Sequence, residues 1–220
     1  MILKDKFEKI WSMFKNPVQW QTLEEELYPV LMYLKGNMLN AGCGERDIQK
    51  FLLSQGVLSI ENCDINSSIL NTIKCDLTQI PRPTNTYDTI LCNAVLEHVQ
   101  FPVLVIKELR RVLKPEGVLI LCVPFLQPYH ASPTDYQRYT KDGLIELARL
   151  CNFDVIKISP VHTIAQTISW ILWAHFTEKK KWLHKIVFWL PIYFWSKSSI
   201  RSDLSSSNSA NAFQVVLKKR

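Results

Sequence analysis

Glycine is scarce in this sequence, and several familiar metal and targeting patterns are missing from it. Only 6 of the 220 residues are glycine and 11 are proline, which excludes collagen-like and low-complexity chains. The six cysteines include no C-x-x-C pair, so the spacing of a zinc knuckle is absent. Charges interrupt the first residues every few positions, and we expect no secretory signal. These absences favour a cytoplasmic globular protein whose cysteines are small buried hydrophobic residues.

Positive charge is concentrated in one part of the chain. Hydrophobic residues make up 47% and charged residues 21%, which is enough apolar material for one core, and the net charge is +6. Residues 177–201 contain six basic residues and one acid, Glu178, so they carry most of that net charge. Tryptophan and other aromatic residues are frequent in the same segment. This pattern favours an anionic membrane surface or a lipid-borne substrate as partner and argues against nucleic acid.

Short apolar runs alternate with amphipathic stretches between residues 37 and 160. This alternation is typical of an α/β protein with a parallel sheet wound on both faces. We expect strands at 38–41, 57–64, 73–76, 87–92, 118–123, 153–158 and 212–217, and helices near 47–54, 66–72, 102–113 and 141–151. Pro115 and Gly117 should end the third of these helices in a turn.

The alternation also predicts how the chain is organised. We expect an N-terminal helical extension at 1–35 and a ligand-binding domain formed by 36–160 together with 212–220. Between the two parts of this domain lies an apolar, basic helical insertion at 161–211, which ends in a Ser/Asn-rich loop over 202–211. Neither apolar run of the insertion reaches the roughly 18 residues needed to span a bilayer.

Three strand ends carry residues suited to an adenosine-like ligand. Gly42 and Gly44 follow the first strand, where glycine lets the backbone approach a ligand closely. Asp64 ends the second strand about 20 residues later, and its carboxylate can accept hydrogen bonds from ribose hydroxyls. Asp76 ends the third strand and can accept from an adenine amine. Either acid taken alone can equally be a helix cap or a solvated turn residue.

Taken together, these motifs resemble the class I S-adenosylmethionine-dependent methyltransferases, in the small-molecule branch that contains the ubiquinone and menaquinone methylases. The matching stretches are Leu39–Gly44, the two acids, Tyr87–Ile90, Leu96–His98 and Glu108–Gly117. The resemblance implies a Rossmann-like seven-stranded sheet, mostly parallel with an antiparallel last strand. It also implies S-adenosylmethionine as cofactor, with a binding set of Asn40, Ala41, Gly42, Cys43, Gly44, Asp64, Ile65, Asp76, Leu77 and Asn93.

A polar loop after the fifth strand offers candidate acceptor groups. His130 can act as a general base because its ordinary pKa is near 6.5, and Asp135 can orient it. Arg138 can hold an anionic acceptor, with Tyr129 and Tyr136 as further substrate-binding candidates. Equally, Asp135 and Arg138 can form a structural ion pair within the loop.

His98, near the fourth strand end, is a second candidate base, or else a polar residue that lines the cofactor pocket. Methyl transfer from a sulfonium requires no metal, and no spacing of residues in the sequence predicts a metal site.

The insertion and the methyltransferase resemblance together set the functional expectation. We expect a methyltransferase that acts on a small or lipid-linked acceptor, at an oxygen of a glycan or an isoprenoid-related compound. One alternative is a cofactor-binding scaffold without turnover, which is suggested by Asn40 and Arg46 because these two residues depart from the family pattern. The other alternative is an RNA or protein methyltransferase. The segment 161–201 can contact the inner face of a membrane peripherally, close over the site as a lid, or form a homodimer.

Overall fold

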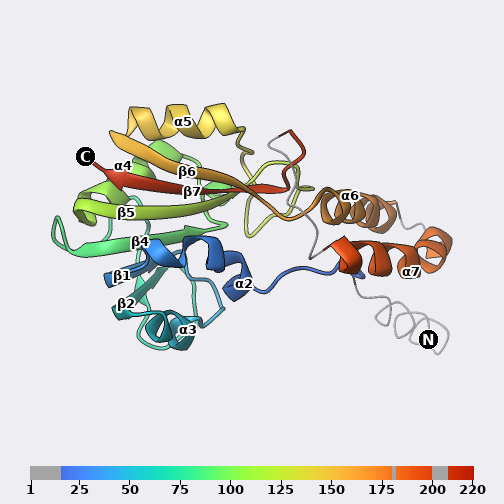
Figure 1. The fold of residues 1–220 in the computed structure, drawn as a ribbon, viewed down its shortest axis with the longest axis horizontal. Coiled ribbons are helices and arrows are strands. Elements are labelled where there is room, and N and C mark those ends of the chain that lie inside the picture. Colours follow the sequence, from blue (N-terminus) through green and yellow to red (C-terminus); the bar gives the residue numbers. More distant parts are fainter. Residues whose placement is uncertain (1–15, 180–181, 200–207) are drawn as a thin grey trace.

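The computed structural model describes residues 16–179, 182–199 and 208–220, and its centre is one seven-stranded sheet (Figure 1). The strands lie in the order β3-β2-β1-β4-β5-β7-β6. Their bounds are β1 Gly36–Ala41, β2 Val57–Asp64, β3 Ile73–Lys74, β4 Tyr87–Asn93, β5 Leu113–Pro124, β6 Phe153–Val161 and β7 Ala212–Lys219. Strands β1 to β5 pair in parallel, whereas β7 runs antiparallel to β5 and β6. The predicted fold class is therefore confirmed.

The strand order places several strand ends at one edge of the sheet. Strand β1 pairs in parallel with β2 on one side and with β4 on the other, so the chain reverses its winding direction at β1. We call the edge where β1, β2, β4 and β5 end the carboxyl edge. Open α/β sheets bind their ligands at this edge, next to the strand where the order reverses.

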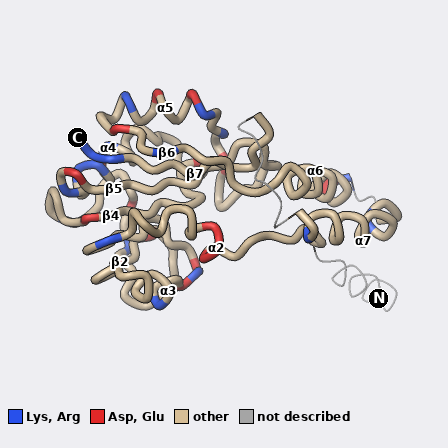
Figure 2. The backbone as a smooth tube through the Cα atoms, viewed as in Figure 1, with Lys and Arg blue, Asp and Glu red and all other residues tan. Residues whose placement is uncertain are grey.

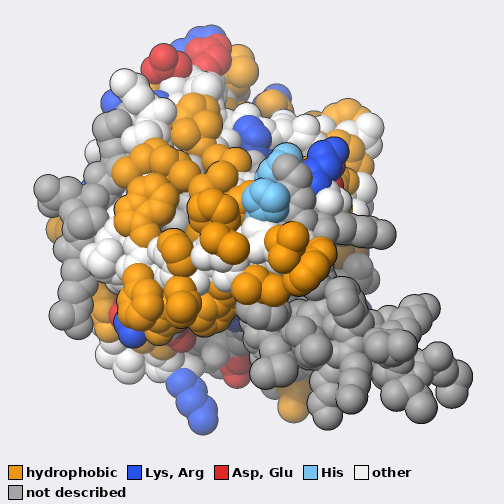
Figure 3. Space-filling view, turned by 90° about the vertical axis from the view of Figure 1, so that its right-hand side faces the viewer, with side chains coloured by type: hydrophobic (Ala, Val, Ile, Leu, Met, Phe, Trp, Pro, Cys, Tyr) orange, Lys and Arg blue, Asp and Glu red, His pale blue; other side chains and the backbone are white. Residues whose placement is uncertain are grey.

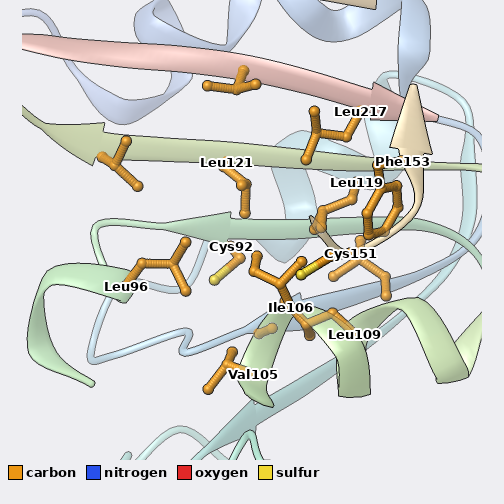
Figure 4. Close-up of a cluster of buried hydrophobic side chains, with 14 of the residues drawn as sticks. Cys92, Leu96, Val105, Ile106, Leu109, Leu119, Leu121, Cys151, Phe153 and Leu217 are labelled. Carbon is orange, nitrogen blue, oxygen red and sulfur yellow. The ribbon is translucent and has the colours of Figure 1, made fainter. Parts of the chain in front are cut away.

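Helices cover both faces of the sheet. Helices α4 (Pro102–Val112) and α5 (Lys141–Leu150) pack on one face, and α2 (Leu23–Leu27), the 3-10 helix η1 (Tyr28–Tyr33) and α3 (Gln49–Ser54) pack on the other (Figure 1). The spacing of Val105, Ile106 and Leu109 predicted the buried face of α4, and all three are fully buried under the sheet (Figure 4). This packing fixes the positions of the strand ends at the carboxyl edge.

Two long helices form a hairpin between β6 and β7 in the chain. They are α6 (Ile164–Glu178) and α7 (Trp182–Ser199), and they project away from the sheet (Figure 1). The pairs Val161↔Ala212 and Pro124↔Ala212 place the base of the hairpin at the carboxyl edge, where β5 ends. Its interior is small: Trp173, Phe176 and Ile192 pack with Val18.

The outer surface of the hairpin is apolar. Figure 2 shows few charges on α6 and α7, and Figure 3 shows hydrophobic side chains gathered on the end of the molecule where the hairpin lies. The exposed large side chains of the hairpin are Ile164, Ile168, Ile171, Leu172, Trp182, Leu183, Ile186, Val187, Phe188, Leu190, Phe194 and Trp195. Within the described ranges, neither helix combines the length and apolar character that crossing a membrane requires.

The predicted helix near residues 66–72 is wrong. This segment is a series of bends and turns, and Asn71 has a positive φ of 62°. The reason is that its serines bond to the glycine loop: Ser67 Oγ donates to Gly44 O at 2.6 Å, and the Ser68 amide donates to a Glu45 carboxylate oxygen at 2.9 Å. Ser67 Oγ also accepts the Ile69 amide at 3.1 Å, a local bond that serine often makes in place of a helix.

The helix predicted to end before Pro115 does end, at Val112, and Glu116 has a positive φ of 64°, but Pro115–Gly117 lies within β5, which begins at Leu113. Leu113 pairs with Tyr87, and a register shift between Tyr87 and Thr89 absorbs the additional residues as a bulge. The Lys114 ammonium holds this end of β5 against β4 by donating to both carboxylate oxygens of Asp88, at 2.9 and 2.8 Å. The helix predicted within residues 1–15 and most of the loop predicted at 202–211 lie outside the described residues.

Two cysteines correct the expectation that all six are unpaired. Cys63 and Cys75 form a disulfide between β2 and the end of β3, across a sequence separation of 12 residues. Cys43, Cys92, Cys122 and Cys151 are free. Because β2 and β3 are parallel neighbours, the disulfide joins the strand ends directly before Asp64 and Asp76.

Candidate active site

The glycine loop turns tightly out of β1 at the carboxyl edge. Gly42 has a φ of +71°, and its amide donates to Cys63 O at 2.7 Å. A Cβ atom at Gly42 would lie 2.4 Å from a Val95 methyl carbon, so only glycine fits there. Gly44 has a φ of +56°, and no atom lies within 4 Å of the position that its Cβ would take. The loop therefore packs against Val95 at Gly42, whereas the space next to Gly44 is open.

Asp64 and Asp76 stand at neighbouring strand ends, as the sequence predicted. One Asp64 oxygen accepts the Gly44 amide at 2.9 Å, and the other accepts the amides of Asn66 and Ser67 at 2.8 and 3.1 Å. The exposed Asp76 carboxylate accepts from the Thr78 amide and hydroxyl, at 2.8 and 2.9 Å. Both acids thus order their own loops as turn residues.

The remaining predicted cofactor residues divide into buried and accessible ones. Asn40, Ala41 and Leu77 are buried, and the Asn40 amide donates to Asn62 Oδ1 at 3.1 Å inside the sheet. Cys43 is also buried, whereas Ile65 is exposed and Asn93 is half-buried at the end of β4. The space beside Gly44 and the two acids at the strand ends fit an adenosine-containing ligand with its polar groups along this edge.

Beyond the glycine loop, two histidines and one carboxylate converge. Glu97 and His98 belong to the 3-10 helix η2 (Leu96–His98), which follows β4, and His130 lies on the loop after β5. The two imidazole rings are 5.5 Å apart between centroids, and each Nε2 atom lies 3.8 Å from Glu97 Oε1. The Glu97 side chain is only 1% exposed, and its Oε2 atom has no hydrogen-bond partner in the described part of the chain.

Backbone carbonyls orient both imidazoles. His98 Nδ1 lies 2.5 Å from Thr134 O, and His130 Nδ1 lies 2.9 Å from Pro128 O. A carbonyl can only accept, so each Nδ1 carries the proton and each Nε2 is directed at Glu97. The Glu97 carboxylate is the main cause that raises the pKa of His130 above its usual value, and partial burial opposes this rise.

Asp135 makes no hydrogen bond to the imidazole of His130, although its charge contributes to raising the pKa of that ring. Its carboxylate accepts from both terminal nitrogens of Arg138, and it accepts the His130 backbone amide at 2.8 Å. His130 Nδ1 lies 3.8 Å from Asp135 Oδ2, too far for a hydrogen bond. The Arg138 guanidinium holds the pKa of Asp135 well below its usual range. The second interpretation, a structural ion pair, describes this contact.

The same ion pair occupies Arg138, which was predicted to hold an anionic acceptor. Its guanidinium also donates to Gln127 O at 3.3 Å and to Pro128 O at 3.0 Å, so it fixes the loop that carries His130. Tyr129 and Tyr136 are exposed, and the Tyr136 amide donates to Glu97 O at 2.7 Å. Loop 128–138 is thus bonded directly to η2.

Sequence reasoning missed two members of this arrangement. Glu97 was part of a quoted motif but received no role, although a glutamate beside a histidine at a strand end was a usable signal. Trp170 of α6 lies in the predicted apolar insertion and received no role, yet its ring lies 5.7 Å from the His130 ring between centroids. No pattern within either segment indicates that contact, because the hairpin and loop 128–138 meet only through the fold.

Comparison with known proteins supports the assignment of the fold. Residues 39–121 match a family model described as a methyltransferase domain. A Burkholderia thailandensis 1,6-didemethyltoxoflavin N1-methyltransferase, solved with its substrate and S-adenosylhomocysteine, has 13% identity and a TM-score of 0.59, covering 98% of this chain and 83% of its own. An Archaeoglobus fulgidus SAM-dependent methyltransferase has 15% identity and a TM-score of 0.59, covering 90% and 93%.

A third similar structure carries another activity on the same fold. The [4+2]-cyclase SpnF has 15% identity and a TM-score of 0.58, covering 90% of this chain and 79% of its own. No protein of curated function matches the sequence. The match over 39–121, the sheet topology and the glycine loop with its two acids agree with one another. Residues 39–121 therefore match a methyltransferase domain, and the whole chain has the Rossmann-like fold of the S-adenosylmethionine-dependent methyltransferases.

Proposed function

We propose that this methyltransferase methylates an oxygen atom of a small or lipid-linked acceptor, such as a glycan or an isoprenoid-related compound. The observation that carries the proposal is the position of the apolar hairpin. Its base lies at the carboxyl edge, and Trp170 packs against His130. An acceptor with a polar head and an apolar tail would have its reactive end near His130 and its tail along the hairpin.

The chemistry requires an aligned acceptor and a place for one proton. S-adenosylmethionine, when bound, supplies a methyl group on a positively charged sulfur and leaves as the thioether S-adenosylhomocysteine. The glycine loop and the acids Asp64 and Asp76 would hold this cofactor at the carboxyl edge. A hydroxyl acceptor must lose its proton, and His130 would take it, because Glu97 stabilises the imidazolium that forms. His98 faces the same carboxylate and would position the hydroxyl.

The hairpin surface supports a lipid environment for the acceptor. Apolar side chains on α6 and α7 are exposed over most of both helices, and Lys179 and Lys197 lie at their ends. Helices of this kind rest in the plane of a membrane interface, where basic residues meet anionic headgroups. We therefore propose peripheral contact with an anionic membrane. A lid that closes over the site and a dimer interface are the competing uses of this surface.

Radiolabelled methyl transfer tests the acceptor class. The full chain would be incubated with labelled S-adenosylmethionine and either a total lipid extract or an aqueous metabolite extract. Label in the organic phase, released by reagents that cleave methyl ethers or methyl esters, would support the proposal. Label confined to the aqueous extract, or carried on nitrogen or carbon, would refute the lipid-linked acceptor or the oxygen acceptor respectively.

Liposome co-sedimentation tests the membrane contact. Leu190 and Phe194 are exposed on α7, and replacing both with glutamate would remove two apolar side chains from the interface. Each contributes about 1.5–3 kcal/mol when buried, so binding to anionic vesicles should fall at least about a hundredfold. Leu58→Glu, at an exposed position on β2, is the matched control and should bind as wild type does. Equal binding by all three proteins, or a wild-type dimer that the double variant dissociates, would refute the membrane contact.

A further inference from the structure

Glu97, His98 and His130 form a cluster whose geometry suits a metal ion. One ligand atom from each residue can be chosen so that all three atoms lie within 4.8 Å of one another. Both Nε2 atoms are 3.8 Å from Glu97 Oε1, which is too long for a hydrogen bond. Ligand atoms on one tetrahedral zinc ion lie roughly 3.4 Å apart, given bond lengths near 2.0–2.2 Å. The three groups therefore surround a common point from slightly outside bonding range.

The hydrogen bonds around the histidines prepare them as ligands. Each Nδ1–H donates to a backbone carbonyl, that of Thr134 for His98 and that of Pro128 for His130. In its neutral form each imidazole therefore has its lone pair on Nε2, the atom that faces Glu97. A hydrogen bond of this type is usual for metal-binding histidines, because it fixes the tautomer and the direction of the ring.

The buried carboxylate of Glu97 is the independent sign of a missing ligand. Its side chain is 1% exposed, and Oε2 has no hydrogen-bond partner among the residues that the structure describes. An unsatisfied buried carboxylate oxygen is costly, and a cation between Glu97 and the imidazoles would offset that cost. Arg138 is a nearby positive group, but its terminal nitrogen lies 3.4 Å from Nδ1 of His130, and its guanidinium is paired with Asp135.

We infer that Glu97, His98 and His130 bind one divalent transition-metal ion of the zinc class. Two imidazoles and one carboxylate are the protein ligands of catalytic zinc sites that keep a position open, and other first-row divalent metals accept the same set. The two histidines are partly exposed, at 15% and 30%, so an open position would be accessible from their side. The sequence spacing showed no metal motif because Glu97 and His98 lie in η2, whereas His130 lies on the loop after β5.

A metal at this point would refine the proposed methyl transfer, and this role rests on that proposal. Coordination to a divalent cation lowers the pKa of a bound hydroxyl, so the acceptor would give its proton to water instead of to His130. The acceptor oxygen would then be held at the cluster by the metal, with the glycine loop positioning the cofactor. Metal binding itself requires neither substrate nor turnover.

Direct titration with metal tests the site. The full chain, stripped with EDTA, would be titrated with Co²⁺ alone while its visible absorption is followed, and Zn²⁺ would then be added as competitor. We expect one equivalent of Co²⁺ with a tetrahedral-type spectrum, which Zn²⁺ abolishes. Loss of an outer-shell partner typically costs 10–100-fold in affinity, so Glu97→Gln and His130→Ala should each cost at least roughly a hundredfold.

Matched measurements make the result decisive. His184→Ala removes an exposed histidine of α7 and should leave the Co²⁺ spectrum and affinity unchanged. Binding of S-adenosylhomocysteine, measured by calorimetry in EDTA, reports separately whether each variant is folded and whether the cofactor site exists. If wild type shows no stoichiometric Co²⁺ or Zn²⁺ binding, or if folded Glu97→Gln and His130→Ala bind as tightly as wild type, the metal site is refuted, whatever the outcome for methyl transfer.

Discussion

Replacing Gly42 with alanine should destabilise the protein by a predictable amount. The backbone φ of +71° costs a residue with a Cβ about 1–2 kcal/mol. The new Cβ would also lie 2.4 Å from a Val95 methyl carbon, and overpacking a filled position typically costs about 1–3 kcal/mol. We therefore expect Gly42→Ala to lower the free energy of unfolding by about 2–5 kcal/mol. Urea denaturation at neutral pH would measure the loss.

Gly44→Ala is the matched control, because it shares the backbone cost without the clash. Its φ is +56°, and no atom lies within 4 Å of its Cβ position. The expected loss is the backbone cost alone, about 1–2 kcal/mol. A methyl group there would, however, enter space that we assign to the cofactor, so binding of S-adenosylhomocysteine should weaken more than stability does.

The contact with Val95 can be isolated in a double-mutant cycle. Val95→Ala removes both methyl groups that a Cβ at Gly42 would meet, so the double variant should be more stable than the sum of the single losses predicts. Equal losses for Gly42→Ala and Gly44→Ala, with no coupling to Val95, would refute the reasoning that Gly42 is required by a close approach.

Two further changes give opposite signs of stability. Cys75→Ser removes the bond to Cys63 and should lower the free energy of unfolding by about 2–3 kcal/mol under oxidising conditions, since a closed loop of about 15 residues is worth about 3 kcal/mol. Dithiothreitol should lower the stability of the wild type by the same amount and leave the variant unchanged. A wild type whose stability does not respond to dithiothreitol would contradict the bond. Burial raises the pKa of Glu26 to about 7, so the folded protein keeps a proton that the unfolded chain releases near 4.5, and stability declines as pH rises between these values. Glu26→Gln should therefore be more stable than wild type at pH 8 by on the order of 3 kcal/mol. Calorimetric scans should show no difference in stability at pH 4, where both proteins are uncharged at this position. Identical scans at pH 8 would contradict the raised pKa of Glu26.

The parts of the fold that repeat a local pattern were predictable from the sequence. Helix α4 has its apolar residues at three- and four-residue spacing and begins at Pro102, so both its face and its start could be read directly. The apolar run at 118–123 similarly predicted a strand buried on both sides. At the site, Gly42, Asp64 and Asp76 could be placed together because parallel strands end at the same edge.

What could not be predicted depends on contacts between distant segments. The helix expected at 66–72 is absent because Ser67 and Ser68 bond to a loop more than twenty residues earlier. The Cys63–Cys75 bond requires β2 and β3 to be neighbours, which cysteine spacing does not reveal. Asp135 is only five residues from His130, yet the side chain of Arg138 takes its carboxylate.

The position of the insertion would let this chain combine the proposed cofactor site with an acceptor of its own. β6 and β7 are antiparallel, so a segment inserted between them starts and ends at the carboxyl edge, whatever its length. The cofactor groups follow β1, β2 and β3, on the other half of the same edge. Changes in α6 and α7 can therefore alter what meets His130 through Trp170 without disturbing the strands that hold Gly42, Asp64 and Asp76. The proposed acceptor and cofactor sites therefore use different strands of one shared edge, and substitutions in α6 and α7 should change acceptor use without weakening binding of S-adenosylhomocysteine.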